Sequence, residues 1–313
     1  MAQAELLEDG GAVVASDEFF RSTEFMTAEG VTHTLRIASG EEELLAPVVV
    51  RDIPGSGGVD ASSPYGYPGI SPQSSVLSPQ SVRPDEIDWS ETGLVSVFLR
   101  HSLGFDPPLA GATERGVVQI ADPALPPKSR MSDRQQIRRN ERRGLEIRIL
   151  AGPEANEADR VGFRRAYEET MRRAEAAERY FFAAEYFAGI LGSPRSWLLL
   201  ALEPGGELAA ASIAVQSDGM LHYYLSGTAD EHLRGSPMKS IVAAMIEFAA
   251  ERGLPLNLGG GVRPGDPLEE FKRGFANREQ PFRTHELVCD PEAYERLSAG
   301  REAVDFFPAY RAG

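Results

Sequence analysis

Hydrophobic and polar positions follow a regular order through the second half of the chain. Short apolar runs bounded by turn residues, such as Pro204-Gly205-Gly206 and Asp218-Gly219, are typical of buried strands, and apolar positions three and four residues apart predict helices. The predicted strands are 145–150, 197–202, 208–216, 220–227, 254–258 and 284–289, and the predicted helices are 159–179, 184–191, 237–252 and 267–273. This β-α-α-β-β-β-α-β-α-β order indicates a mixed α/β fold.

The first half has a different pattern, because a long loop separates its predicted strands. Strands are expected at 31–38, 44–50, 94–100 and 116–120, and a helix is expected to begin after Ser16, its predicted N-cap. Residues 53–84 are rich in Gly, Ser and Pro, which predicts a loop. Within it, the segment SPYGYPG at 63–69 forms either a packed cover over a core or one wall of a substrate site.

Charge is distributed unevenly along the chain. The net charge of −15 over 313 residues argues, as an average, against a phosphate-rich partner. Residues 1–127 hold 19 acidic and 6 basic side chains, whereas residues 128–313 hold 28 acidic and 26 basic side chains. Because this change coincides with a proline-rich segment at 122–129, we expect an N-terminal domain at 1–127 and a C-terminal domain at 128–313.

The composition excludes several classes of protein. The single cysteine, Cys289, cannot form an intramolecular disulfide or a cysteine-based zinc site. The N-terminal residues lack a cationic secretion signal, and no apolar run approaches the roughly 20 residues of a membrane span. Neither a P-loop nor a dinucleotide-binding glycine pattern is present. We therefore expect a cytoplasmic monomer with no membrane span, no cofactor and no metal.

A dense group of arginines follows the predicted boundary. Residues 128–148 hold eight basic and three acidic side chains. If Ser132 caps a helix with Gln135 three residues later, one face of that helix carries arginines at four-residue spacing with two more beside them. These arginines are Arg134, Arg138, Arg139, Arg142 and Arg143. They suit the phosphates of an RNA acceptor arm, and a solvated helix face is the alternative.

One of only three lysines in the chain, Lys272, lies in the last turn of the predicted helix 267–273. Asp266 can cap this helix, with a proline at its first position and Glu269 at its third, which places Lys272 and Arg273 together near its end. There the two cations either act in a site or complement the helix dipole.

A second candidate group lies on the predicted strand 220–227, and a glycine triplet, Gly259-Gly260-Gly261, follows the later strand 254–258. Alternation places His222 and Tyr224 on one face of strand 220–227 and Tyr223 on the other. His222 is a candidate base near neutral pH, and a hydrogen-bonded core histidine is the alternative. Either tyrosine can orient an amine. The glycine triplet either contacts a ligand through its bare backbone or forms a plain turn.

Four stretches of the sequence, taken in order and spacing, resemble the FemABX family of aminoacyl-tRNA-dependent transferases. The resemblance covers roughly residues 95 to 297. Its four stretches are 95–101, 130–144, 221–227, and 256–261 followed by 268–275, which includes the pattern Phe-Lys-x-x-Phe. The loop at 65–69 is similar to the aromatic glycine-rich segment of the family.

The resemblance implies two GNAT-like mixed α/β domains in tandem, with substrates held in a cleft between them. It implies attack of an acceptor amine on the ester carbonyl of an aminoacyl-tRNA, with Lys272 opposite the developing oxyanion and His222 as the candidate base. The expected substrate contacts are Tyr65, Tyr67, Arg100, Tyr223, Tyr224, Gly260, Gly261 and Arg273.

Two other functions stay open. An acyl-CoA-dependent GNAT N-acyltransferase binds pyrophosphate at a helix start, and here the matching segment 232–237 has one glycine and a proline at that start. A non-catalytic binding protein with the same fold is the second alternative. The expected acceptor is a peptidoglycan precursor or an amine-bearing small molecule, and the absence of a long insertion for a coiled-coil arm suits a soluble acceptor.

Overall fold

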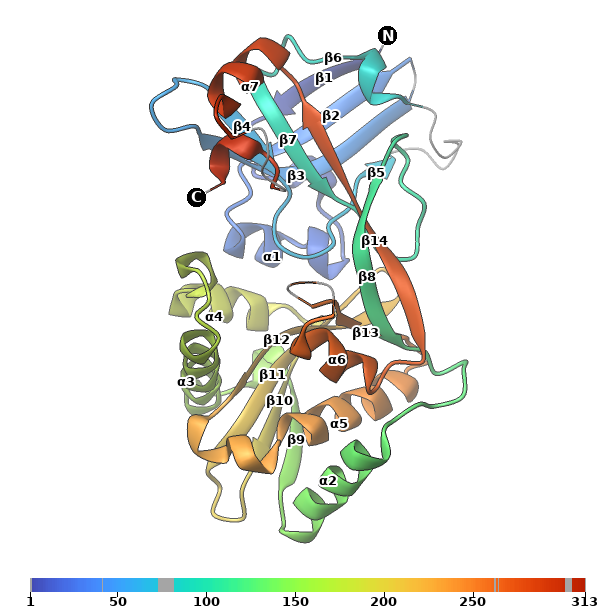
Figure 1. Ribbon diagram of the computed structural model, residues 1–313, viewed down its shortest axis with the longest axis vertical. Coiled ribbons are helices and arrows are strands. Elements are labelled where there is room, and N and C mark those ends of the chain that lie inside the picture. The colour runs from blue at the N-terminus through green and yellow to red at the C-terminus, as the bar shows by residue number, and fades with distance from the viewer. Residues whose placement is uncertain are drawn as a thin grey trace. The chain divides into compact units, whose positions relative to one another are not determined.

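The computed structural model describes residues 2–40, 42–72, 82–261, 263, 265–301 and 306–312. The chain forms two compact units, one of residues Met1–Arg115 and Pro281–Gly313 and the other of residues Gly116–Gln280 (Figure 1). The chain passes from unit 1 to unit 2 within strand β8 and returns within strand β14. The predicted domain boundary near residue 127 lies in the loop after β8, and the division into domains 1–127 and 128–313 stays a prediction.

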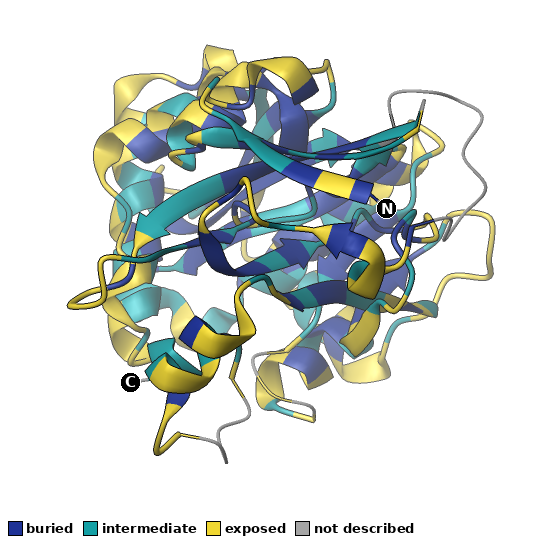
Figure 2. Cartoon of the chain, turned by 90° about the horizontal axis from the view of Figure 1, so that it is seen from above, coloured by how far each residue is buried: buried dark blue, intermediate teal, exposed yellow. Residues whose placement is uncertain are grey.

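Unit 1 is built on a mixed sheet with the strand order β6-β1-β2-β3-β4-β7-β14, with β5 beside β3. Its elements are β1 (Ala2–Leu7), α1 (Thr23–Ala28), β2 (His33–Ser39), β3 (Glu42–Asp52), β4 (Val59–Ser62), β5 (Ser71–Pro72), β6 (Ile87–Asp88), β7 (Leu94–Arg100), β14 (Arg278–Val288) and α7 (Pro291–Ser298). Alternation in β2 buries Leu35 and Ile37, while Arg36 between them pairs with Glu5 and Glu43. Figure 2 shows buried positions along the strands and exposed positions on the surrounding turns and helices.

The first helix of unit 1 begins later than the sequence predicts. Its N-cap is Ser22, whose hydroxyl accepts a hydrogen bond from the backbone N–H of Phe25 at 3.2 Å. The predicted cap at Ser16 is wrong, because a short 3₁₀ helix over Phe19–Arg21 comes first. This turn lets Phe19 and neighbouring phenylalanines bury completely in one aromatic cluster. Core packing therefore outweighs the local capping signal here.

Unit 2 is a mixed sheet with the strand order β8-β13-β12-β11-β10-β9. Its elements are β8 (Thr113–Ala121), α2 (Met131–Arg142), β9 (Glu146–Ala151), α3 (Glu157–Arg173), α4 (Ala184–Gly192), β10 (Ser196–Leu202), β11 (Leu208–Ser217), β12 (Met220–Thr228), α5 (Met238–Ala250), β13 (Leu256–Gly259) and α6 (Pro267–Arg273). From β9 to β14 the element order is the predicted one, which confirms the α/β class. Helices α3 and α4 cover one face of the sheet, and α5 packs on the other (Figure 1).

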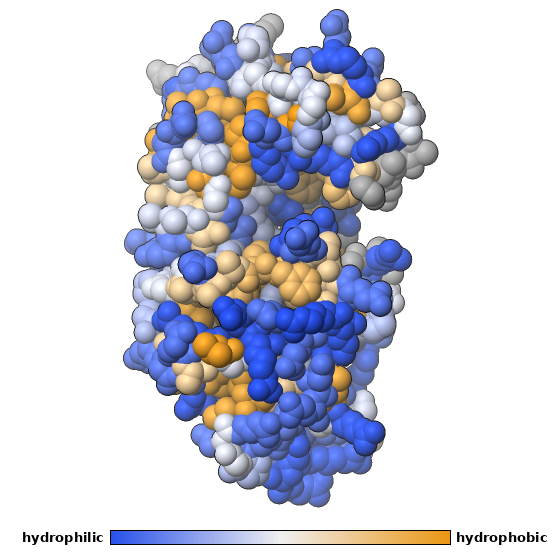
Figure 3. Space-filling model, turned by 90° about the vertical axis from the view of Figure 1, so that its left-hand side faces the viewer, coloured by the Kyte–Doolittle hydropathy of each residue, from blue (hydrophilic) through white to orange (hydrophobic). Residues whose placement is uncertain are grey.

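Helix α3 begins with a capping box and ends earlier than predicted. Asn156 and Asp159 satisfy each other's backbone N–H groups at its start. The helix stops at Arg173, and Glu175 then adopts a left-handed conformation with φ 49°. The chain can thereby turn so that Phe182 stacks on Tyr186 at 4.0 Å between ring centroids. Figure 3 views the side that carries α3 and α4, where hydrophilic side chains make up much of the surface.

The core of unit 2 lies between α5 and the sheet. Ile241, Val242 and Met245 of α5 are fully buried against strand residues that include Leu199 and Leu256. This is the apolar face that the helical spacing predicts. No helix among the described residues is long and apolar enough to cross a membrane.

Candidate functional site

The candidate site lies where two parallel strands of unit 2 stop pairing. Among the described residues, β12 and β13 pair at Leu221 with Leu256 and at His222 with Asn257, and β12 then continues without β13 to Thr228. A register shift against β11 makes Tyr224 the extra residue of a β-bulge at this point. The backbone of β12 therefore changes course where the ladder to β13 ends.

Three consecutive glycines follow this point. At each of them a Cβ atom would come close to a neighbouring atom. Gly259 has φ +79°, and a Cβ there lies 3.1 Å from the Lys272 amine nitrogen. A Cβ on Gly260 meets the backbone oxygen of Val117 at 2.9 Å, and a Cβ on Gly261 meets Oδ1 of Asp266 at 2.5 Å. The glycines let the chain run close to β8 and α6. Their contact with a substrate stays a prediction.

Lys272 projects from α6 onto this glycine segment. Asp266 caps α6 by accepting the N–H of Glu269 at 2.7 Å, as the sequence predicts. The Lys272 side chain is buried, and its amine donates a hydrogen bond of 2.6 Å to the carbonyl oxygen of Gly260. The same nitrogen lies 5.9 Å from the centroid of the Tyr223 ring. Glycine backbone, amine and aromatic ring thus meet in one place.

The Lys272 ammonium is held in an unfavourable environment. Burial lowers the pKa of Lys272 from its usual range to about 8, and the carboxylate of Asp266 opposes part of that shift. An ammonium has three donors, and among the described residues Lys272 uses one of them, to Gly260. The group therefore remains a cation at neutral pH and has donors left for an anionic oxygen.

His222 is enclosed by hydrogen bonds instead of facing a substrate. Its Nδ1 lies 3.1 Å from Nδ2 of Asn257, and its Nε2 lies 3.3 Å from the carbonyl oxygen of Ser217. Burial lowers the pKa of His222 to about 4. These are the contacts of a hydrogen-bonded core histidine, the alternative that the sequence left open. A role as base stays a prediction that this geometry does not support.

The two tyrosines of β12 have different partners. The Tyr223 hydroxyl donates to Ser226 at 2.6 Å, and burial raises the pKa of Tyr223 to about 12. The Tyr224 hydroxyl is 2.8 Å from the hydroxyl of Tyr186 on α4. Tyr223 is thus the tyrosine that lies beside Lys272, while Tyr224 contacts the α4 side. The substrate contacts of both tyrosines stay predictions.

Arg273, the neighbour of Lys272, is surrounded by carboxylates. It forms ion pairs with Glu269, with Glu270 at 2.7 Å and with Glu279 at 3.6 Å. Its charge is therefore largely neutralised within the chain, and its predicted contact with a substrate stays untested.

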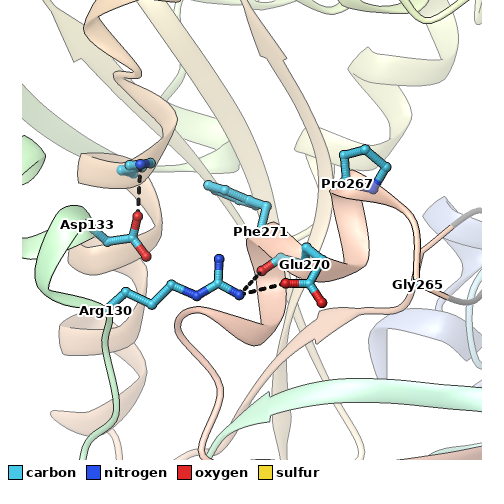
Figure 4. Close-up of a pocket in the computed structure, with 7 residues that line it drawn as sticks. Arg130, Asp133, Gly265, Pro267, Glu270 and Phe271 are labelled. Carbon is cyan, nitrogen blue, oxygen red and sulfur yellow. Dashed lines mark hydrogen bonds and ion pairs between the residues drawn. The ribbon is translucent and has the colours of Figure 1, made fainter.

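A polar pocket opens beside α6 (Figure 4). Its lining residues are Arg130, Asp133, Lys239, Gly265, Pro267, Glu270 and Phe271. Arg130 donates two hydrogen bonds of 2.9 Å to Glu270, one to its carbonyl oxygen and one to its carboxylate. Lys239 pairs with Asp133 at 2.8 Å. Both cations of the pocket thus have a carboxylate partner, and these contacts connect α2 to α5 and α6.

The arginine-rich helix is present as predicted, although its cap is not. Helix α2 begins at Met131, and Ser132 lies inside it, so the predicted cap at Ser132 is wrong. All five predicted arginines are exposed: Arg134, Arg138, Arg139, Arg142 and Arg143. Arg138 and Arg139 form no ion pair with any described residue, and with Arg142 they line a shallow hollow. Arg143 pairs with Glu203 at 2.9 Å. Binding of RNA by these side chains stays a prediction.

Side chains of α2 also cover the start of α5, where a GNAT enzyme binds the pyrophosphate of CoA. Gln136 donates to the carbonyl oxygen of Gly235 at 2.9 Å, and Asn140 donates to the Ser240 hydroxyl at 3.0 Å. The guanidinium of Arg143 lies against Gly235, within 2.8 Å of where a Cβ would stand. This segment is therefore occupied by contacts from within the chain.

The remaining predicted site residues lie together in unit 1. Arg100 donates to the carbonyl oxygen of Ser63 at 2.9 Å and so holds the start of the aromatic loop. The Tyr67 ring packs edge to face on Phe20, with centroids 5.6 Å apart, whereas Tyr65 is exposed. Tyr67 thus fits the packed cover that the sequence allows. Substrate binding by this loop and by Arg100 stays a prediction.

One group of described side chains has the spacing of a metal site. Ligand atoms of Glu207, Glu231 and His232 lie within 4.8 Å of one another. Both carboxylates are exposed, and Glu231 pairs with Arg165 at 3.3 Å. We assign no ion to this group.

Sequence reasoning missed Asn257, which joins the glycine segment to His222. Its Oδ1 accepts the backbone N–H of Gly259 at 2.8 Å, and it is buried. One signal was available, because Asn257 is a lone polar residue in an apolar strand just before three glycines. A buried polar side chain at such a position requires partners.

Comparison with known proteins identifies the fold. Residues 127–273 match the family described as acetyltransferase (GNAT) domain. The solved structure of FemX has a TM-score of 0.63 at 12% identity, covering 93% of this chain and 99% of that one. L-PGS from Bacillus licheniformis has a TM-score of 0.57 at 13% identity, covering 86% and 87%. The C-terminal domain of a putative lysylphosphatidylglycerol synthetase from Agrobacterium fabrum also scores 0.57, at 14% identity, covering 91% and 92%.

These likenesses confirm the expected fold, a FemABX-like tandem GNAT architecture of mixed α/β type. No curated protein sequence matches the chain.

Proposed function

We propose that the protein is an aminoacyltransferase, which forms an amide between the amino acid of an aminoacyl-tRNA and an amine-bearing acceptor. The observation that carries the proposal is the buried Lys272 ammonium, held by Gly260 at the point where β12 and β13 separate. An isolated buried cation is costly, so its placement beside bare backbone favours a role toward an anion.

The reaction needs little covalent help from the protein. The acceptor nitrogen attacks the ester carbonyl, the new C–N bond forms and the ester C–O bond breaks. The proton of the amine ends on the oxygen of the leaving tRNA. Negative charge develops on the carbonyl oxygen in between, and the Lys272 ammonium is the group that stabilises it. Tyr223, whose ring lies next to that ammonium, is the substrate-positioning residue of the proposal.

Helix α2 supports an RNA donor. It presents five exposed arginines, four of which have no carboxylate partner among the described residues, while Arg143 pairs with Glu203. Phosphates bind such side chains by displacing counterions, so the helix suits the acceptor arm of a tRNA. The resemblance to the FemABX family points to the same donor.

An acyl-CoA donor has less support, because the start of α5, where its pyrophosphate would bind, is covered by other side chains. The start of α5 is covered by Gln136 and Arg143 from α2, and the segment before it offers one glycine, Gly235. Pyrophosphate binding at this helix start needs exposed backbone N–H groups, which those side chains crowd. The alternative predicts activity with acyl-CoA and none with charged tRNA.

Transfer from total tRNA charged with labelled amino acids tests the proposal. The acceptors are a nucleotide-linked muramyl pentapeptide and a panel of small amines. We expect labelled amide only with intact tRNA, and its loss after ribonuclease treatment. Product formation that survives ribonuclease and depends on an acyl-CoA contradicts the proposal.

The same assay tests Lys272. The variant Lys272→Ala should lose about 100-fold or more in turnover, the usual cost of removing one oxyanion donor, while tRNA affinity changes less than about threefold. Lys128→Ala, which removes an exposed lysine, is the matched control and should retain turnover. Near-normal turnover of Lys272→Ala removes this residue from the mechanism.

A further inference from the structure

We propose that Asn257 and His222 are positioning residues, which fix the Gly259–Gly260 backbone so that the Gly260 carbonyl holds the Lys272 amine in place. The inference is about how Lys272 is held in place. Only its tests by turnover rest on the proposed function. It assigns His222 a role different from that of a base.

A single chain of buried hydrogen bonds carries the inference. It runs from the Ser217 carbonyl to His222, then to Asn257, and from Asn257 to the N–H of Gly259. One peptide further on, the Gly260 carbonyl accepts from Lys272 at 2.6 Å. His222 is 3% exposed and Asn257 is 2% exposed, so water does not compete for the bond between their side chains.

The chain fixes both the amide orientation and the histidine tautomer. Because Oδ1 of Asn257 accepts the Gly259 N–H, its Nδ2 is the atom that faces His222. Nδ2 is a donor, so Nδ1 of His222 is the acceptor and the ring proton lies on Nε2. That proton is donated to the Ser217 carbonyl. The ring is therefore neutral with both nitrogens in use, and it has no lone pair for a substrate proton.

Gly259 needs this support because its conformation is not the default one. It has φ +79°, and a glycine samples many backbone conformations when nothing holds it. The Asn257 side chain bonds the Gly259 N–H directly and so selects one conformation. That conformation directs the next carbonyl, of Gly260, at the amine. The carboxylate of Asp266 and the Tyr223 ring on β12 lie near the amine, whereas Glu269 and Arg273, in the same helix as Lys272, pair with each other.

The chain has only three lysines, which makes a direct test possible. Lysine labelled with ¹³C at the ε carbon gives three NMR signals, and Lys→Arg variants assign them. In the wild-type protein, Lys272 should titrate near pH 8, below the usual range of a lysine. In Asn257→Leu, the amine loses the fixed acceptor that favours its charged form, so its titration should move down by at least one pH unit. This readout needs neither donor nor acceptor.

Controls separate positioning from general damage to the fold. Ser212→Ala removes another buried hydrogen bond, from Ser212 to the Leu225 carbonyl on β12, and should leave the Lys272 titration unchanged. Asn257→Asp keeps an oxygen for the Gly259 N–H but has no donor for Nδ1 of His222, so it should recover only part of the turnover that Asn257→Leu loses. For Asn257→Leu we expect at least a tenfold lower kcat, with the KM for charged tRNA within threefold.

Imidazole ¹⁵N spectra test the role of His222 separately. We expect the Nε2–H tautomer with no titration between pH 5.5 and 8, because burial lowers the pKa of His222 by more than the Asp218 carboxylate raises it. A Lys272 titration that is the same in Asn257→Leu and in the wild type overturns the inference, as does a His222 that becomes protonated near pH 6.5. Failure of tRNA-dependent transfer with these NMR results intact overturns the proposed function alone.

Discussion

The charge of one residue, Lys272, sets how the proposed site depends on pH. Its amine is buried beside a glycine backbone, and burial penalises the charged form. The pKa is therefore lowered, to about 8, and the ammonium is present below that pH and lost above it. The acceptor amine needs the opposite state, because only its neutral form attacks a carbonyl. A fall of rate at alkaline pH therefore reports Lys272, not the acceptor.

This argument predicts a pH profile that a single substitution changes. For the wild type, kcat should fall as pH rises through about 8. In Lys272→Arg the guanidinium stays charged, so the rate should be lower at pH 7 but should no longer fall between pH 7.5 and 9. Initial rates are measured with charged tRNA and corrected for spontaneous ester hydrolysis.

Lys128→Arg is the control and should keep the alkaline fall. If Lys272→Arg falls in the same way as the wild type, the titrating group is not Lys272.

Single residues differ in how far the sequence predicts them. The position of Lys272 could be predicted because Asp266, which caps the same helix, is only six positions away. Local capping rules are enough to predict where such a short helix begins. His222 could not be resolved, because its partner Asn257 lies 35 positions away and contacts it only through the pairing of β12 and β13. Local patterns report local partners, whereas the state of a buried titratable group depends on contacts across the sheet.

At the scale of elements, α2 was predicted from charge and found with an unexpected second face. Its inner side is polar, since Asp133 and Asn140 are buried and bond to α5. The pattern of hydrophobic residues could not reveal this packing. Polar side chains of α2 contact α5 at positions where most packed helices carry apolar side chains. The same helix therefore presents arginines outward while its inner face fixes the start of α5.

The exposed arginines of α2 lead to a prediction about how tRNA binding depends on salt concentration. Arg138→Glu with Arg142→Glu should weaken tRNA binding and reduce the slope of log K against log salt by between about 1 and 2, as expected when two phosphate contacts are lost. Binding is measured by fluorescence anisotropy at several KCl concentrations.

Arg164→Glu with Arg172→Glu makes the same charge change on α3, where both arginines pair with Glu168. This control should leave the slope within about 0.5 of the wild-type value. An unchanged slope for the α2 variant means that this face of α2 is only solvated.

At the scale of the whole molecule, the acidity of the chain belongs to one of its two units. Unit 1 holds 24 acidic and 10 basic side chains, whereas unit 2 holds 23 acidic and 22 basic. The sequence shows a change of charge near residue 127, but it could not show that the last 33 residues belong to unit 1. That return depends on β14 pairing with β7, a contact between segments far apart in the chain. The net charge of −15 therefore says little about what unit 2 binds.

The division also predicts which part of the chain folds without the other. Unit 2 is one continuous segment, and its core of α5 and the central strands lies within residues 116–280. Unit 1 needs both ends of the chain, because α7 packs Ala293 against Ile53 and Val95, and Arg311 neutralises the buried Asp60. Without Arg311, Asp60 retains only Arg51 as a charged partner among the described residues, and an incompletely paired buried carboxylate is strongly destabilising.

We expect fragment 116–280 to give dispersed NMR spectra and one cooperative thermal transition by circular dichroism. Fragment 1–115 should lack both and should gain them when residues 281–313 are co-expressed with it. The full-length variant Arg311→Met is the matched test of the Asp60 contact and should lose about 3 kcal/mol of stability. A folded fragment 1–115 shows that the returning segment is dispensable, and an unfolded fragment 116–280 shows that unit 2 depends on the rest of the chain.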